Sequence, residues 1–524
     1  MFSTVPRISI EIDGFTLASE IIQTIHEIRV RQILSSPSQC EIVLQEAHEA
    51  ISAEVLSKIG AAIHIKVGHQ EQSLFYGQIT AVEQHYNASI RPLIHIRAYD
   101  LLHRLRKHQP VRTHIKVDFY QLAEELTHDA GIAVVEKKST PVTPRLVQYR
   151  QSDLELLSEL GRSYGLYFFL DKQDLRITSL NGYETGEHLT LGKNLFEARF
   201  SVNADTITQS VNTTGWNLQR TVSHIKNAQT AGTEMPVHKF IDTARFSTDG
   251  QHNIVDYNCE NDLLAETAAQ SELDRRVAQQ VTLWGIAQGN VNLTPGAAVQ
   301  VSGVNASLES RYVLTETCHS ITPDKGFISE IHTATPAFTS VQKKALKNAT
   351  VGIVSQVNDP DNLGRIKVSL PTYSDIETDW LEVLIPGAGA GKGQFILPDV
   401  GDNVLLLFIN EEPAQPIVLG GLYGEKPIPD TVVDQGVVKR YVTQTAGKQR
   451  FLLDDTENTI RIETQNGHYI SLTPAEIGIT RNNGSSVTLT DDRMTIHSET
   501  NLEIEAPGNK ITIRGKRIDF EEAS

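Results

Sequence analysis

Between Thr459 and Glu521, apolar residues recur in short alternating pairs. The two members of each pair stand at positions i and i+2, which face the same side of a β-strand, while polar residues face the other side. The pairs predict eight short strands, with a new strand beginning every seven to ten residues. The sixteen apolar positions are Ile460, Ile462, Ile470, Leu472, Ile477, Ile479, Val487, Leu489, Met494, Ile496, Leu502, Ile504, Ile511, Ile513, Ile518 and Phe520.

No amphipathic helix accompanies these strands in the sequence to cover their apolar face. A single chain of such strands would bury little and would expose edges that invite pairing, and a single-chain solenoid needs about 20 residues or more per coil. Three copies around one axis are the smallest closed prism in which each chain supplies one wall. We therefore predict a trimeric β-prism over residues 427–524, called the needle below, with the sixteen positions as its core. An ordinary β-sandwich is the alternative.

The chain before the needle divides into four predicted segments, which makes the expected fold mainly β. Five strand patterns in the last of these segments are typical of a small closed barrel of the oligonucleotide/oligosaccharide-binding (OB) type. The segments are a first β-barrel at 1–110, a helical and hairpin segment at 111–184, a second β-barrel at 185–345 and the OB-type barrel at 346–426.

Four helices are predicted from apolar residues at helical spacing. Asp118 is expected to cap one helix, and the next helix is expected to open at Ser152-Asp153 and to end at Gly161 or Gly165. A hairpin is predicted just after the second of these helices. A third helix is expected from about 262 to 280 with an apolar stripe of Leu263, Leu264, Ala268, Leu273 and Val277, and a fourth over Ala47–Ile59.

Composition limits the classes of binding partner and the cellular compartment that we expect for this protein. The 524 residues carry a net charge of −17, which argues against a nucleic-acid surface and against attraction to anionic lipid. Three scattered cysteines predict neither a disulfide framework nor a zinc site, and they fit synthesis in a reducing cytoplasm. The first residues lack the pattern of a signal peptide, and no apolar run is long enough to suggest a membrane span.

Several motifs resemble chemical sites but lack a defining part. Gly387–Gly393 has one residue too few between its glycines for a phosphate-binding loop, and it lacks the hydroxyl residue. Asn358–Asn362 lacks the spacing and the terminal Glu of a calcium loop, so we expect a turn. The histidines from His85 to His128 form no HExxH, and the paired acids lie in turns. We expect no catalytic residue, no cofactor and no metal, and hence no enzyme.

Several runs of the sequence resemble VgrG-type spike proteins of contractile injection systems, which are related to phage baseplate hub and spike proteins. In the barrel the similar runs are 352–368, LPDVGDNV at 397–404 and PIVLGGLY at 416–423. In the preceding chain they are QYRQSDL at 148–154, YGLYF at 164–168 and 75–80. The form is most similar to the spikes of extracellular particles such as the antifeeding prophage and the Photorhabdus virulence cassettes, because little sequence separates barrel from needle and little follows the last strand pair.

The resemblance implies a homotrimeric hub of two tail-tube-like barrels per chain, so that six similar units face the ring of the inner tube. It also implies that the hub caps this tube and organises the baseplate, and that the needle pierces the target cell envelope. A separate PAAR-like tip protein would dock near Ile518, Phe520 and Ser524. Two alternatives stay open: a cell-wall glycan hydrolase with a β-rich binding module, and a glycan-binding tail fibre.

Overall fold

The computed structural model describes residues 5–45, 57–68, 72–87, 90–205, 207–217, 222–232, 250–258, 261–336, 349–409 and 412–522. The chain forms two compact units, Met1–Leu422 and Tyr423–Ser524. The first unit contains the hub, which we define as the described residues up to 336, and the barrel at 349–422. No helix among the described residues is both long and apolar enough to cross a membrane.

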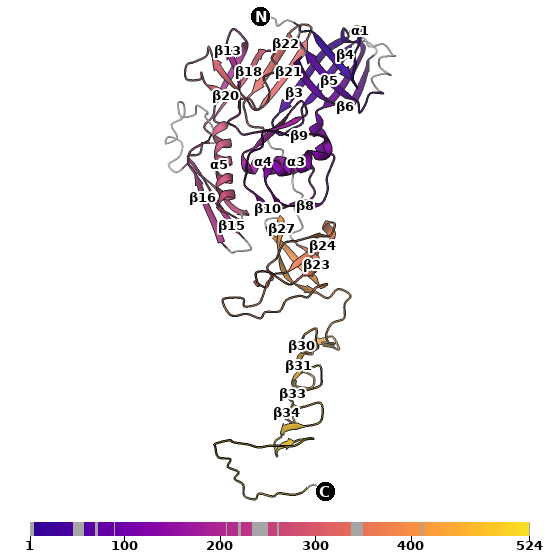
Figure 1. Ribbon diagram of the computed structural model, residues 1–524, viewed down its shortest axis with the longest axis vertical. Helices are drawn as coiled ribbons and strands as arrows, with labels where there is room; N and C mark the ends of the chain where they lie inside the picture. The colour runs from indigo at the N-terminus through magenta and orange to yellow at the C-terminus, as the bar shows by residue number, and fades with distance from the viewer. Residues whose placement is uncertain are drawn as a thin grey trace. The chain divides into compact units, whose positions relative to one another are not determined.

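The hub is built on an eleven-stranded sheet with the order β14-β18-β22-β21-β3-β4-β7-β6-β5-β1-β2 (Figure 1). Its strands from the first predicted barrel are β1 (Ile8–Ile12), β2 (Phe15–Thr16), β3 (Ile25–Ile33), β4 (Gln39–Gln45), β5 (Ala62–Val67), β6 (Gln72–Asn87) and β7 (Ile90–Tyr99). Those from the second are β14 (Leu195–Val202), β18 (Val281–Gln288), β21 (Glu316–Thr322) and β22 (Gly326–His332).

The two predicted barrels of the hub have separate cores but share this sheet. Antiparallel pairing of β3 with β21 joins them, with Val30 opposite His319. One core gathers residues of β1 to β7 and also takes in Ile321 and Phe327 from the second segment, while the other is centred on β18 and β19. The seam between β3 and β21 therefore connects parts of the chain nearly 300 residues apart.

Smaller sheets complete the hub. β8 (Arg112–Val117) pairs with β10 (Thr143–Gln148), and the predicted hairpin is present as β11 (Tyr167–Asp171) and β12 (Asp174–Thr178), joined by β9 (Ala133–Val134). The other sheets consist of β13 (Tyr183–Thr190), β19 (Ala297–Ser302) and β20 (Arg311–Val313), and of β15 (Ser210–Asn217), β16 (Val222–Ala228) and β17 (Gln251–Asn258).

The helix predictions that fall on described residues are confirmed in position. Asp118 caps α3 (Phe119–Thr127) and Ser152 caps α4 (Asp153–Tyr164), each through a reciprocal capping box. The left-handed Gly165 ends α4. The third helix is α5 (Asp262–Ala278), but Leu263 is exposed, so its placement in the apolar stripe was wrong. A short α1 (Ser19–Ile22) and the turns η1 (Leu101–Arg106) and η2 (His128–Ala130) complete the hub.

Leu263 is exposed because it lies on the side of α5 opposite the buried stripe. At about 100° per residue, the buried Leu264, Ala265, Ala268, Ala269 and Leu273 share one face, and Leu263 points away from its centre. The fourth predicted helix, Ala47–Ile59, lies mostly outside the described residues.

The barrel is a five-stranded sheet in the order β25-β24-β23-β26-β27. Its elements are β23 (Ala349–Gln356), β24 (Lys367–Leu370), η5 (Pro371–Tyr373), β25 (Ile376–Glu377), β26 (Asn403–Ile409) and β27 (Glu412–Leu422). One of the five strands expected in the barrel, at 380–385, forms only isolated bridges, from Leu381 to Ile366 and from Val383 to Val418. These bridges connect it to the residue before β24 and to the end strand β27, and Leu381 is buried in the core.

The needle contains a seven-stranded antiparallel meander, drawn as a ladder in Figure 1. The strands are β30 (Arg440–Gln444), β31 (Arg450–Asp454), β32 (Thr459–Glu463), β33 (Tyr469–Leu472), β34 (Ile477–Thr480), β35 (Ser486–Leu489) and β36 (Met494–His497), after a small pair β28 (Val433–Asp434) and β29 (Val437–Val438). Five of the eight predicted strands are present. The three predicted after residue 500 are not strands in the single chain.

The two compact units separate after Leu422. The predicted segment boundaries, including the one after residue 426, stay predictions.

His319 at the seam generates a prediction about acid stability. Its ring is buried, with Nδ1 2.8 Å from Ser329 Oγ, and burial lowers its pKa to about 4. The folded hub therefore binds this proton less tightly than the unfolded chain, whose histidine titrates near ~6.5. The stabilising contribution is full above pH ~6.5 and is lost as the pH falls toward about 4, which amounts to about 2–3 kcal/mol by pH ~4.5.

His319→Gln, which cannot take up the proton, should lose less stability than the wild type between pH 7 and 4.5. Urea unfolding followed by tryptophan fluorescence measures the difference. His128→Gln is the matched control because the His128 side chain is 86% exposed. Equal pH dependence in wild type and His319→Gln would contradict the assignment.

Candidate trimer interface

The register of the needle strands aligns the predicted core residues into two continuous rows. Antiparallel pairing places residues of adjacent strands directly opposite each other, where their side chains share one face. One row consists of Ile462, Ile470, Ile479, Val487 and Ile496. The other consists of Ile460, Leu472, Ile477, Leu489 and Met494. Ten of the sixteen predicted positions thus form one apolar face.

This apolar face is open in the single chain. Nine of its ten side chains are between 41% and 63% exposed, and Val487 is half-buried. On the opposite, polar face, Ser471 is only 6% exposed and Gly478 is buried. An ordinary soluble sheet covers its apolar side and leaves its polar side in water. The needle does the reverse, which is the property of a surface that another protein surface covers.

Side-chain contacts within the chain hold the polar side of the needle. The Arg461 guanidinium stacks over the Tyr469 ring at 4.0 Å, and Arg440 Nε lies 2.6 Å from the buried Asp454 carboxylate. Asp454 also accepts backbone hydrogen bonds from Thr456 and Glu457, and these bonds together with Arg440 hold its pKa below the usual range. These contacts link β30 to β31 and β32 to β33 and close the turn after β31 without help from the apolar face.

Two strands that the sequence analysis missed extend the same rows. Leu453 is opposite Ile460 and Phe451 is opposite Ile462, and Tyr441 of β30 is opposite Leu453. Phe451 and Tyr441 are 40% and 58% exposed. The alternation of Phe451 with Leu453 just before the turn at Asp454 was the available signal, but the turn was considered only as a pair of acids.

The remaining six predicted core positions lie beyond the ladder. All are exposed, from 47% at Ile511 to 90% at Phe520, and they belong to no strand. They also include two of the residues predicted to dock a tip protein, Ile518 and Phe520. The third, Ser524, lies outside the described residues. The six positions therefore share the exposure of the apolar face but not its geometry.

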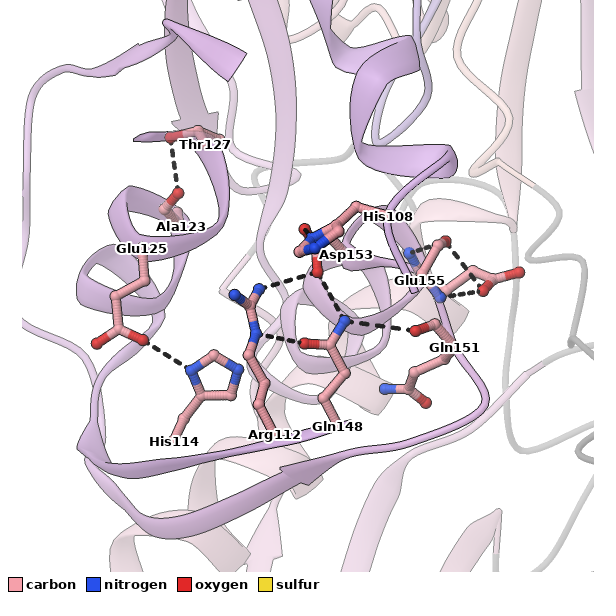
Figure 2. A network of polar contacts seen from close by, with 11 residues as sticks. His108, Arg112, His114, Ala123, Glu125, Thr127, Gln148, Gln151, Asp153 and Glu155 are labelled. Carbon is pink, nitrogen blue, oxygen red and sulfur yellow. Dashed lines mark hydrogen bonds and ion pairs between the residues drawn. The ribbon is translucent and has the colours of Figure 1, made fainter. Parts of the chain in front are cut away.

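The run at 148–154, which the sequence analysis compared with the spike proteins, has a structural role in the hub (Figure 2). The side chain of Asp153, on the first turn of α4, is only 5% exposed. It accepts hydrogen bonds from Arg112 at 2.9 Å and from Gln148 Nε2 at 2.7 Å, and it lies 2.8 Å from His108 Nδ1. These contacts tie β8 and β10 to the start of α4. The buried carboxylate is fully paired, so it anchors secondary structure.

The loop at Asn358–Asn362 is a turn, as predicted. The guanidinium group of Arg365 pairs with the carboxylates of this loop. Asp359 accepts hydrogen bonds from Arg365 Nε at 3.0 Å and from Arg365 NH2 at 2.7 Å. It also accepts from the backbone N–H groups of Asp361 and Leu363. The Arg365 guanidinium, with these N–H groups, holds the pKa of Asp359 well below its usual range. Among the described residues, no group of three or more His, Cys, Asp or Glu side chains could hold a metal ion.

Three family models match this chain. Residues 350–423 match the injector OB domain of the type VI secretion system and phage baseplate, and residues 440–503 match the C-terminal trimerisation domain of phage baseplate V. Residues 3–323 match the Alg8 N-terminal domain. The second match coincides with the meander and its open apolar face.

One curated protein and two solved structures are similar to this chain. The type VI secretion system spike protein VgrG3 of Vibrio cholerae is 35% identical over 68 residues, which is 12% of this chain but only 7% of that relative's length. An E. coli component of the type VI secretion system has a similar structure, with a TM-score of 0.53 at 15% identity over 79% of this chain and 99% of that one. A Francisella PdpA-VgrG complex, half-lidded, gives a TM-score of 0.52 at 11% identity over 94% of this chain and 89% of that one.

A shared hub sheet, an OB-type barrel and a trimerisation-type meander define a phage-tail-like spike protein of the VgrG type. The model of the Alg8 N-terminal domain matches more than half of the chain, so the chain belongs to that family.

Removal of the Asp359 carboxylate should destabilise the barrel. Asp359→Ala leaves Arg365, whose side chain is only 7% exposed, without its main partner, and breaking a buried pair costs about 3–5 kcal/mol. Thermal unfolding should show the loss. Asp361→Ala is the control, because this carboxylate also contacts Arg365 but is 67% exposed and should cost at most about 1 kcal/mol. A rise in wild-type stability on addition of calcium would contradict the assignment of this loop as a turn.

Proposed function

We propose that three copies of this chain form the spike and hub of a contractile injection machine. The apolar faces of three needles meet on a common axis, and the sixteen predicted positions, together with Tyr441, Phe451 and Leu453, line it. The observation that carries the proposal is the pair of unbroken apolar rows that the chain itself leaves uncovered. The match of residues 440–503 to a trimerisation domain supports it.

The energetics favour association through this face. Covering a large apolar side chain contributes about 1.5–3 kcal/mol, and nine of the ten ladder positions are between 41% and 63% exposed in the single chain. The gross gain per copy is therefore on the order of ten kcal/mol or more before the entropic cost of association is subtracted. The polar side of each sheet needs no reorganisation, because its contacts are already formed within the chain.

The hub and the needle have different proposed partners. In the proposed assembly the hub caps the inner-tube ring and organises the baseplate, and the needle carries a PAAR-like tip protein and pierces the target envelope. In this proposal the chain is made in the cytoplasm, acts without catalysis or cofactor and binds no nucleic acid. The five predicted segments are its proposed domains. The glycan-hydrolase and tail-fibre alternatives gain no support from the family matches.

Light scattering of the purified chain tests the proposal directly. The chain mass is 58.0 kDa, so a trimer has three times this mass, about 174 kDa. A monomer mass at micromolar concentration would overturn the proposal.

Ile496→Asp should abolish the trimer, because three carboxylates would meet on a dry axis at a cost of several kcal/mol each. Thr495→Asp is the matched control on the same strand: Thr495 is opposite Thr488 on the polar side and is exposed. It should keep the trimer. The molecular mass of each variant, measured by light scattering, shows which face of the sheet forms the interface. If Ile496→Asp stays trimeric and Thr495→Asp becomes monomeric, the polar side is the interface.

A further inference from the structure

Residues 501–522 continue the apolar alternation of the needle without forming strands. Within this described segment the hydrogen bonds join positions only two or three apart, as between Arg517 and Asp519 or between Asn509 and Ala506. By contrast, β30 to β36 form an unbroken antiparallel ladder. The same sequence pattern is therefore folded in one part of the needle and unpaired in the next.

We propose that residues 501–522, called the extension below, fold into three further strands only when three copies associate, and that they do so in one fixed register. This inference rests on the proposed trimer. It adds that the extension folds only after three copies have associated. The occupants of the extension's apolar face are the two other copies of this chain.

Apolar pairing fixes the register of the extension. Continuing the antiparallel meander from β36 places Ile504 opposite Met494 and Leu502 opposite Ile496. In the next step Ile511 is opposite Ile504 and Ile513 is opposite Leu502, and in the last Phe520 is opposite Ile511 and Ile518 is opposite Ile513. Each step thus prolongs the two apolar rows of the ladder. A slip of one residue would place apolar residues against polar ones.

The turns of the extension lie where this register needs the chain to reverse. The segment Ala506-Pro507-Gly508-Asn509 is already closed by a 2.9 Å hydrogen bond from Asn509 N–H to Ala506 O, and Gly508 has φ of 72°. Pro followed by a glycine of positive φ is the sequence of a type II turn. The next turn would be Gly515-Lys516, and glycine at the first of two loop positions suits a type II′ hairpin.

Charges on the polar face give an independent check of the register. The pairing that aligns the apolar rows also places Arg493, Glu505, Lys510 and Glu521 side by side on four neighbouring strands. Their signs alternate, and opposite charges in directly opposed positions stabilise a sheet. One pair, Arg514 with Arg517, is of like charge, but Asp519 lies 2.9 Å from Arg517 and compensates it.

The single chain cannot hold these strands for a physical reason. A hairpin with both faces in water is only marginally stable. The strands β30 to β33 gain additional stability from side-chain contacts on their polar side, such as Arg440 with Asp454 and Arg461 with Tyr469. The described extension shows no cross-strand side-chain contact of this kind. Its strands therefore depend on burial of the apolar face, which only the other copies provide.

Hydrogen exchange with mass spectrometry of the full chain tests the conditional step. Amides of the extension should be protected at least about tenfold in the wild-type trimer and should exchange freely in Ile470→Asp, whose substitution in β33 blocks association far from the extension. Ile479→Asp is a second blocked variant in case the first misfolds. Protection of the extension in a monomeric variant, or free exchange in the trimer, would overturn the inference.

A pair of cysteines tests the register. Glu503→Cys with Thr512→Cys occupies directly opposed positions, which suit the spacing that a disulfide needs. Glu503→Cys with Arg514→Cys is the control, displaced by two residues. Oxidised trimers should contain the 503–512 link in peptide mass spectra, and a 503–514 link instead would overturn the register. Absence of trimers altogether would overturn the proposed function, whereas trimers with an unprotected extension would overturn only this inference.

Discussion

The architecture of the needle depends on one constraint: a strand of four or five residues offers only two side chains to each face, too few to build a core from one chain. In the hub, a sheet of eleven strands curls around its own apolar residues and buries them, as Ile28, Ile63 and Ile94 show. The needle strands follow one another in a flat meander and have nothing to fold onto. Their apolar face must be completed from outside, and this requirement accounts for the exposure of side chains that would be buried in almost any other setting.

The same constraint explains why the polar side of the needle is so well ordered. A surface that waits for a partner must be held in shape beforehand, or association has to cover the entropy of ordering it as well. Arg440 with Asp454, Arg461 with Tyr469 and the buried Ser471 hold β30 to β33 in register from behind. The apolar face is thus presented as a formed surface over the ladder.

The sequence predicted those features that depend on local periodicity. The needle strands from Thr459 to His497, the caps of α3 and α4 at Asp118 and Ser152, and the turn at Asp359 follow from spacing and side-chain chemistry over a few residues. The candidate interface was predicted on the same basis, except for Tyr441, Phe451 and Leu453. Leu263 was misplaced because a helix end has no preceding turn to fix its face. The β3–β21 seam could not be predicted, since nothing local in Val30 or His319 indicates a partner nearly 300 residues away.

The exposed apolar face would be a hazard if the chain folded far ahead of finding its partners, because open sheet surfaces and unpaired edges promote aggregation. The division of the needle limits this hazard only in part, because β36 is an end strand of the sheet while the extension is unpaired. The extension itself adds no further regular edge before assembly. Once three copies have closed around the axis, alternating charges such as Arg493, Glu505 and Lys510 select one register for it. Association would then start on a preformed surface and end on a segment that only the correct assembly can order, which makes completion of the needle a consequence of having the right number of chains.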